Sequence, residues 1–182
     1  MNLRLNIARL YIPVSIKKRK LQELFELTAD AFQSDLPPIK NLSYNACLEA
    51  YARFSKSKAE EAVKLTDKTE MVRKRLYRNA FQMGEKLRRD FRIRTKTDVL
   101  RLSRILYRIL RIDFTGNASG EVMIKRCFFS QYYTPEVCGI ISALDEGLAA
   151  GLSAGGRLVF KNRITEGKSC CQAAFSMKDM IA

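Results

Sequence analysis

The spacing of apolar residues changes at Arg111, and this change restricts the possible folds more than any other feature of the chain. Before it, apolar residues recur every three or four positions, as along residues 21–32, which predicts helices. After it, residues 112–129 contain the turn residues of a hairpin and then alternate like a strand. The sequence therefore predicts a basic helical region over 1–111 and an α+β region over 112–182, together forming one compact domain.

A helix and two further strands are expected after this hairpin. The run Thr-Pro-Glu at 134–136 predicts a helix start, because a hydroxyl caps free amides, proline fits the first turn and an acid favours the positive end of the helix dipole. One helix is expected over 135–151, followed by strands over 157–164 and 169–177. Hairpin, helix and hairpin in this order predict an antiparallel sheet of about four strands with the helix on one face.

Capping residues and glycines add detail to this prediction. Ser43 and Thr95 are expected to cap helices, and a capping-box pattern at 57–60 predicts a separate short helix. Gly147 and Gly151 lie about one turn apart, a spacing that is expected to permit close packing of their helix on the sheet.

The positive charge is concentrated before the sheet. The chain has a formal net charge of +14, of which residues 1–116 contribute +13, and residues 71–111 hold fourteen basic and three acidic residues. Such a field favours an anionic partner, which is nucleic acid, an acidic membrane surface, a protein or a small carboxylate. The alternative is a solvated basic face on two amphipathic helices, and no aromatic-interleaved nucleic-acid motif is present.

Three features predict a cytoplasmic protein. No apolar run approaches the roughly 18 residues of a membrane-spanning helix. The apolar N-terminus is interrupted by Arg4 and Arg9 and lacks a small-residue cleavage site, so a secretory signal is not expected. The five cysteines are odd in number and too sparse for a disulfide scaffold, which indicates thiols kept for packing, metal binding or reactivity.

The candidate site is a group of cysteines. The chain has no histidine, so a site must use thiols, carboxylates, hydroxyls, arginines or a bound cofactor. Strand alternation places Cys127 on the same face as Met123, while Cys138 and Asp145 lie within about 20° of one another on the predicted helix. We expect Cys127, Cys138 and Cys171 to converge near the start of that helix, whose dipole lowers the pKa of a thiol.

Two other interpretations of the cysteines remain open. Each thiol taken singly fits core packing, since free cysteine behaves as a small hydrophobe. No compact zinc spacing occurs, and adjacent cysteines alternate across a strand, which disfavours a four-cysteine zinc site. Iron or an iron–sulfur cluster held by Cys127, Cys138, Cys171 and one other ligand is the metal alternative.

The residues around the cysteines form a longer pattern. It runs Cys127-Phe-Phe, Thr134-Pro-Glu-Val-Cys138, Leu144-Asp145-Glu-Gly, Leu158-Val-Phe160-Lys-Asn-Arg163 and Cys170-Cys171-Gln-Ala-Ala-Phe175. This pattern resembles the C-terminal half of the L-2-amino-thiazoline-4-carboxylic acid hydrolase family, and residues 44–54 are similar to the helical half of that family. A fainter similarity runs to the iron-dependent plant carotenoid isomerases of the strigolactone pathway.

The resemblance implies an enzyme that hydrolyses a non-peptide C–N bond in a small, anionic, cyclic substrate. An activated water or a thiolate would act as nucleophile, a carboxyl as general acid and base, and an arginine as the clamp for a substrate carboxylate. The catalytic candidates are then Cys127, Cys138, Cys171 and Asp145, and the substrate-binding candidates are Arg163 and Arg126. Two alternatives remain: an iron or iron–sulfur protein with an isomerase or redox role, and a basic module that binds nucleic acid or a membrane surface through residues 71–111.

Overall fold

The helices and strands follow the predicted order. A computed structural model describes residues 11–177, apart from the side chains of residues 66 and 67, so the segment with Arg4 and Arg9 lies outside it. The helices are α2 (Val14–Phe32), α3 (Tyr44–Val63), α4 (Thr66–Phe91), α5 (Lys96–Ile109), α6 (Pro135–Ile141) and α7 (Ala143–Leu152). The strands are β1 (Ile112–Gly116), β2 (Glu121–Cys127), β3 (Arg157–Asn162) and β4 (Cys171–Ser176), and short 3-10 turns lie at η1 (Phe128–Gln131) and η2 (Ile164–Glu166).

Capping side chains fix three helix starts as predicted. Ser43, Thr95 and Thr134 each accept a hydrogen bond from the backbone amide three residues further on, at 3.2, 3.1 and 3.3 Å. The prediction of a separate short helix that begins at residues 57–60 is wrong, because α3 continues through these residues without a break. Ala59 and Ala62 are fully buried there and continue the apolar face of α3, so packing outweighs the local capping pattern.

The four strands form one antiparallel sheet in the order β1-β2-β4-β3. The predicted α+β fold, a helical half followed by an antiparallel sheet, is therefore confirmed. The first hairpin turns around Asn117, whose side-chain oxygen accepts from the amides of Gly120 and Glu121 at 3.1 and 3.0 Å. The last strand, β4, lies between β2 and β3. The two central strands of the sheet, β2 and β4, therefore come from the first and the last hairpin of the α+β region.

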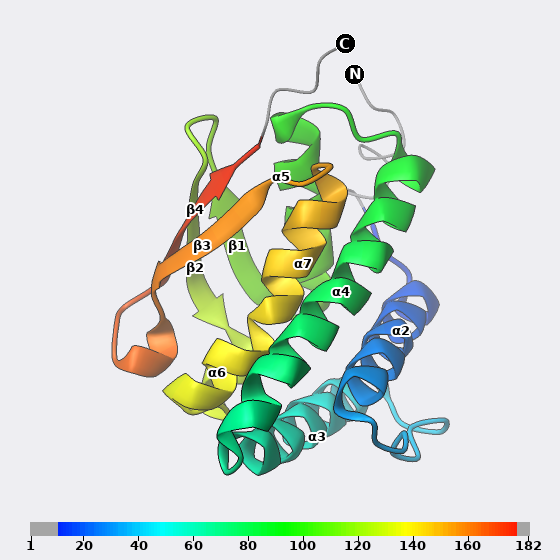
Figure 1. Cartoon of the computed structure of the whole chain (residues 1–182). Helices are drawn as coiled ribbons and strands as arrows, with labels where there is room; N and C mark the ends of the chain where they lie inside the picture. The colour runs from blue at the N-terminus through cyan, green and yellow to red at the C-terminus, as the bar shows by residue number, and fades with distance from the viewer. Residues whose placement is uncertain (1–10, 178–182) are drawn as a thin grey trace.

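The prediction of one continuous helix over 135–151 is wrong, because the segment is divided into α6 and α7 at Ser142. Figure 1 shows the two yellow helices at an angle to one another. The carbonyl of Gly139 accepts from the Ser142 hydroxyl at 3.0 Å and from the guanidinium of Arg73 on α4. Side chains that occupy a helical carbonyl in this way are a usual cause of a kink. Arg73 also pairs with Glu146 on α7 at 3.2 Å, which holds the two segments together.

The helices are arranged in layers on one face of the sheet. Figure 1 shows α7 and α4 side by side next to the sheet, with α2 and α3 beyond α4. One cluster of buried residues joins Leu87 and Ile105 to Phe175, and the other joins Tyr51 to Phe129. Both clusters combine residues from before and after Arg111, so the helical region and the sheet region share their cores.

Backbone contact between α4 and α7 replaces the packing predicted for the two glycines. A Cβ atom on Gly147 would lie 2.1 Å from the carbonyl oxygen of Tyr77, and one on Gly151 would lie 2.2 Å from that of Phe81. Gly84 contributes to the same contact from α4. The prediction that this spacing serves helix–sheet packing is therefore wrong, since the partner is another helix.

The longest helix carries charge on its outer side. α4 has 26 residues, which exceeds the roughly 20 residues needed to cross a bilayer, but Lys74, Arg78 and Lys86 are exposed along it. In residues 11–177, no helix has both the length and the apolar composition of a membrane span.

Substituting Gly147 with alanine tests the α4–α7 contact. The new methyl group meets backbone rather than a flexible side chain, so we expect Gly147→Ala to lower the free energy of unfolding by about 2–3 kcal/mol, measured by urea denaturation. The control is Gly139→Ala in α6, where nothing lies within 4 Å of the added Cβ and where alanine is the better helix former by about 0.5–1 kcal/mol. Equal effects of the two substitutions would contradict the packing described here.

Candidate functional site

A cavity of about 140 Å³ lies between the inner face of the sheet and the helices. Its walls are largely apolar, with side chains that include Leu24, Met83, Leu106, Ile124, Phe129 and Leu148. Its ionisable lining residues are Lys20, Tyr51, Tyr107, Cys127, Tyr133, Cys138, Asp145, Arg163 and Cys171. Five of the six residues singled out from the sequence therefore line one cavity: the three cysteines, Asp145 and Arg163.

A β-bulge turns Cys127 toward the cavity. In the pairing of β1 with β2, Asp113 lies opposite Arg126 and Phe114 opposite Ile124, so Lys125 has no partner in the register. An extra residue in one strand reverses the alternation of faces beyond it. Cys127 therefore lies on the inner face with Ile124, and the predicted grouping of Cys127 with the outer, exposed residues of β2 is wrong.

A second irregularity lies on β3 at the same end of the sheet. Phe160 pairs with Ala173 and Asn162 with Gln172, so Lys161 is left without a partner in the register. The chain then enters the cavity wall with Arg163, whose guanidinium lies 4.9 Å from the centroid of the Phe160 ring. The extra residue aims Arg163 inward by the same change of alternation that turns Cys127.

Arg126, the other arginine considered as a substrate clamp, lies elsewhere. It is exposed on β2, beside the bulge, and is not among the described residues that line the cavity. Of the two arginine candidates, the structure brings only Arg163 to the predicted catalytic residues.

Asp145 is the central polar group of the cavity. It lies in the first turn of α7, and its Oδ1 accepts a hydrogen bond of 2.6 Å from the hydroxyl of Tyr107. Burial raises the pKa of Asp145 to about 6, and the nearby charge of Glu146 adds to this rise. The hydrogen bond from Tyr107 and the charge of Arg163 oppose the rise, but burial outweighs them.

Tyr107 was missed in the sequence, because it lies in the apolar repeat of α5 like an ordinary core residue. Its ring stacks on Phe114 with the centroids 4.7 Å apart, which fixes the hydroxyl at Asp145. Burial, and the negative charge of Asp145, raise the pKa of Tyr107 well above its usual value. Tyr107 is therefore a permanent hydrogen-bond donor at neutral pH.

The three cavity thiols are protonated at neutral pH. Burial raises the pKa of Cys127 to about 12 and that of Cys138 to about 11, and it also raises the pKa of Cys171. The Thr165 hydroxyl and the charge of Arg163 oppose the rise in the pKa of Cys138. The backbone amide of Ile164, which donates to the Cys171 sulfur at 3.3 Å, opposes the rise in the pKa of Cys171. The predicted lowering of a thiol pKa is wrong here, because desolvation by the apolar walls is the largest influence on each sulfur.

The thiols do not form a metal site in this arrangement. Between residues 11 and 177, no group of three or more cysteine, aspartate or glutamate side chains is placed to hold a metal ion. Iron and iron–sulfur centres need several thiolates around one point. The ligand set considered from the sequence, Cys127, Cys138 and Cys171, therefore does not fit such a centre as the structure places it.

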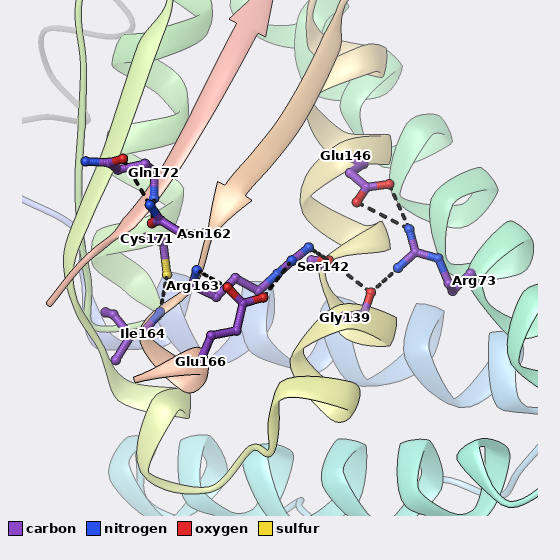
Figure 2. A network of polar contacts seen from close by, with 10 residues as sticks. All are labelled: Arg73, Gly139, Ser142, Glu146, Asn162, Arg163, Ile164, Glu166, Cys171 and Gln172. Atoms are coloured by element: carbon purple, nitrogen blue, oxygen red, sulfur yellow. Dashed lines mark hydrogen bonds and ion pairs between the residues drawn. The ribbon is translucent and has the colours of Figure 1, made fainter. Parts of the chain in front are cut away.

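A polar network holds Arg163 at the cavity wall, as Figure 2 shows. Its Nη2 donates to the Ser142 hydroxyl at 3.1 Å, and its Nη1 lies 3.4 Å from Glu166. Glu166 also accepts from the Arg163 backbone amide at 2.9 Å, which closes the η2 turn. The Nε of Arg163 is buried and has no hydrogen-bond partner among the described residues, so one guanidinium donor is left unpaired at the cavity wall.

The same network extends to the helix kink. Ser142, which accepts from Arg163, donates to the Gly139 carbonyl, and that carbonyl also accepts from Arg73 (Figure 2). The position of Arg163 is thereby tied to the junction of α6 and α7, three residues before Asp145. One connected set of contacts therefore holds Arg163 to the junction of α6 and α7.

The chain matches no model of a known protein family, and no curated protein matches it either. The resemblance to the thiazoline-carboxylate hydrolase family therefore stays a prediction. What the site can do must be argued from its own residues.

The raised pKa of Asp145 predicts a dependence of stability on pH. The folded protein holds this proton more tightly than the unfolded chain, where the pKa of aspartate is near its usual value of about 4. Asp145 therefore favours folding below pH 4, and this contribution is lost as the pH rises through about 6.

We expect the free energy of unfolding of Asp145→Asn, relative to that of the wild type, to increase by roughly 2–3 kcal/mol as the pH rises from 4 to 7. Urea denaturation across that pH range measures this difference. Asparagine keeps an oxygen that accepts from Tyr107, so the comparison isolates the charge. A constant difference between the two proteins over this range would contradict the assigned pKa shift.

Proposed function

We propose that the chain is an enzyme that hydrolyses a cyclic C–N bond in a small molecule with an apolar body and a carboxylate. The observation that carries this proposal is the Asp145–Tyr107 pair in an apolar cavity that also contains a free donor of Arg163. A carboxyl with a pKa near 6 exchanges protons effectively at neutral pH. A mainly apolar cavity with a few converging polar groups is also the usual form of a small-molecule site.

Asp145 would serve both halves of the reaction. As a carboxylate, it accepts a proton from a water molecule, whose oxygen bonds to the ring carbon of the C–N bond. As the carboxylic acid formed in that step, it gives the proton to the leaving nitrogen when the C–N bond breaks. Water is consumed, its hydroxyl ends on carbon and its proton on nitrogen, so the carboxyl is regenerated.

Arg163 would hold the substrate carboxylate. Its Nη groups are already engaged with Ser142 and Glu166, while its buried Nε has no hydrogen-bond partner among the described residues. A carboxylate oxygen bound there would satisfy this donor with a charge-assisted hydrogen bond. The anchored substrate would then present its ring to Asp145 across the cavity.

The thiols act as neutral walls in this proposal rather than as nucleophiles. A thiolate is the reactive form of cysteine, and a pKa of about 11 or 12 leaves very little of it at neutral pH. Even at Cys138, where the Thr165 hydroxyl and the charge of Arg163 both lower the pKa of the thiol, burial outweighs them. We therefore expect Cys138→Ser to retain most of the turnover of the wild type.

A second candidate is a binding protein for small apolar molecules without catalysis. It is supported by the largely apolar lining of the cavity. The two candidates differ in what they require of Asp145, since a passive binder does not need a carboxyl that changes its protonation near pH 6.

The decisive experiment measures turnover of 2-aminothiazoline-4-carboxylate by the wild type and by Asp145→Asn. Loss of the acid/base group should lower kcat by about 10²–10⁴-fold, and the wild-type kcat/KM should rise with pH through about 6 as Asp145 ionises. The control is Glu146→Gln, which removes the adjacent carboxyl that pairs with Arg73, is not among the described cavity-lining residues and adds only to the rise in the pKa of Asp145. It should keep kcat within a few-fold, and equal losses in both variants would rule out the assigned role of Asp145.

The proposed carboxylate site is tested by Arg163→Ala. Loss of a charge-assisted hydrogen bond should raise KM for a carboxylate substrate by about 10–100-fold and have much less effect on the corresponding carboxamide. Arg126→Ala is the matched control, since Arg126 is exposed and lies outside the cavity lining. A similar change in both variants would place the carboxylate elsewhere.

A further inference from the structure

The ring of Tyr44, at the start of α3, lies between two cations from other elements. Lys17 Nζ on α2 is 5.6 Å from the ring centroid, and the guanidinium of Arg111, just after α5, is 5.9 Å from it. The Tyr44 hydroxyl donates to the Ile109 carbonyl, and Arg111 donates to Asn45 Oδ1 at 2.6 Å. Neither cation has an acidic partner in the part of the chain that the structure describes, so an anion beside them would be favoured.

The exposed side of α5 extends this positive charge. Arg101, Arg104 and Arg108 are exposed and fall within an arc of about 60°, since each residue turns by about 100°. Asp98 is the one acidic residue of α5 and lies in the first turn, at the opposite end from Tyr44. The exposed side of α5 therefore presents a row of guanidinium groups.

An exposed apolar side chain borders the same surface. Val14, at the start of α2, is 53% exposed. Val14 and Lys17 are three residues apart on the helix and therefore share a side, and Lys20 and Leu24 continue along it to the cavity. This side of α2 thus connects an exposed apolar end to the cavity wall.

We propose that this face docks the protein on an anionic phospholipid membrane. The membrane-docking surface consists of Lys17, Arg104, Arg111 and Val14. Lipid phosphates would bind the cations, while the Val14 side chain enters the boundary between headgroups and acyl chains. The Lys20 end of the cavity would then face the bilayer, where molecules with an apolar body collect. This inference concerns a surface outside the catalytic residues and goes beyond the proposed hydrolysis.

The composition of the surface favours lipid over nucleic acid. The exposed residues of α5 are Thr97 and arginines, without the aromatic or amide side chains that stack on or read bases. Exposed aliphatic residues such as Val14 gain little on a phosphate backbone, but they gain free energy at the membrane interface.

The test is co-sedimentation of the purified protein with vesicles at low ionic strength. The wild type should bind phosphatidylcholine vesicles that contain about one third phosphatidylserine and should not bind pure phosphatidylcholine vesicles. The double variant Lys17→Ala with Arg104→Ala removes two cations from the surface and should bind the anionic vesicles about 30-fold more weakly. Val14→Ser, which keeps every charge, should weaken binding by a smaller factor.

The matched control is Arg78→Ala with Lys86→Ala, which removes two exposed cations from α4 and so changes the net charge by the same amount. It should bind the anionic vesicles within about twofold of the wild type if location matters rather than net charge. Equal losses in the two double variants would overturn the proposal, as would the absence of wild-type binding to anionic vesicles. Binding of a DNA duplex that depends on Lys17 and Arg104, without vesicle binding, would assign the surface to nucleic acid instead. Circular dichroism of each variant separates lost binding from lost folding.

Discussion

The backbone contact between α4 and α7 determines where the central carboxyl points. Gly147 and Gly151 let α7 approach the carbonyl groups of Tyr77 and Phe81, and this contact fixes the rotation of α7 about its own axis. Asp145 lies two residues before Gly147, so it points about 200° away from the face that touches α4. A helix held by larger side chains would stand farther from α4 and could rotate. The absence of two side chains on one face thus fixes the direction of a carboxyl on the other.

The sheet contributes to the site through its irregular end. Lys125 and Lys161 are both left out of the strand register, and both lie near the end where β4 begins with Cys171. A regular sheet would have turned Cys127 outward, and the two bulges instead bring Cys127 and Arg163 to the inner face. The bulges and the kink between α6 and α7 meet around the same cavity. Regular elements build the core here, and local departures from regularity build the site.

The parts of this structure that the sequence predicts are those encoded locally. Hydroxyl caps identify the helix starts at Ser43, Thr95 and Thr134, and apolar alternation predicts the four-stranded sheet. The order of elements brings Cys138, Cys171 and Asp145 close together, but the inward position of Cys127 and Arg163 depends on the two bulges. The break at Ser142 could not be predicted, because Arg73, which contacts it, is 66 residues from Gly139 in the sequence. Tyr107 looks like any apolar core residue until its hydroxyl is found at Asp145. The face of Cys127 depends on a bulge without a glycine to mark it.

The charges around the cavity make Asp145 the candidate group for the proposed proton transfer. Lys20 is paired with Glu23 at 2.6 Å and Arg163 with Glu166 at 3.4 Å, while the thiols are neutral because burial raises their pKa values. The remaining ionisable group that changes its charge near neutral pH is the carboxyl of Asp145. Burial makes it a better base but also makes its charged form unfavourable in the folded protein. The hydrogen bond from Tyr107 offsets part of this cost, since it favours the carboxylate. The environment that suits the carboxyl to proton transfer therefore also reduces the stability of the fold as the pH rises, a conflict typical of active sites rather than of cores built only for packing.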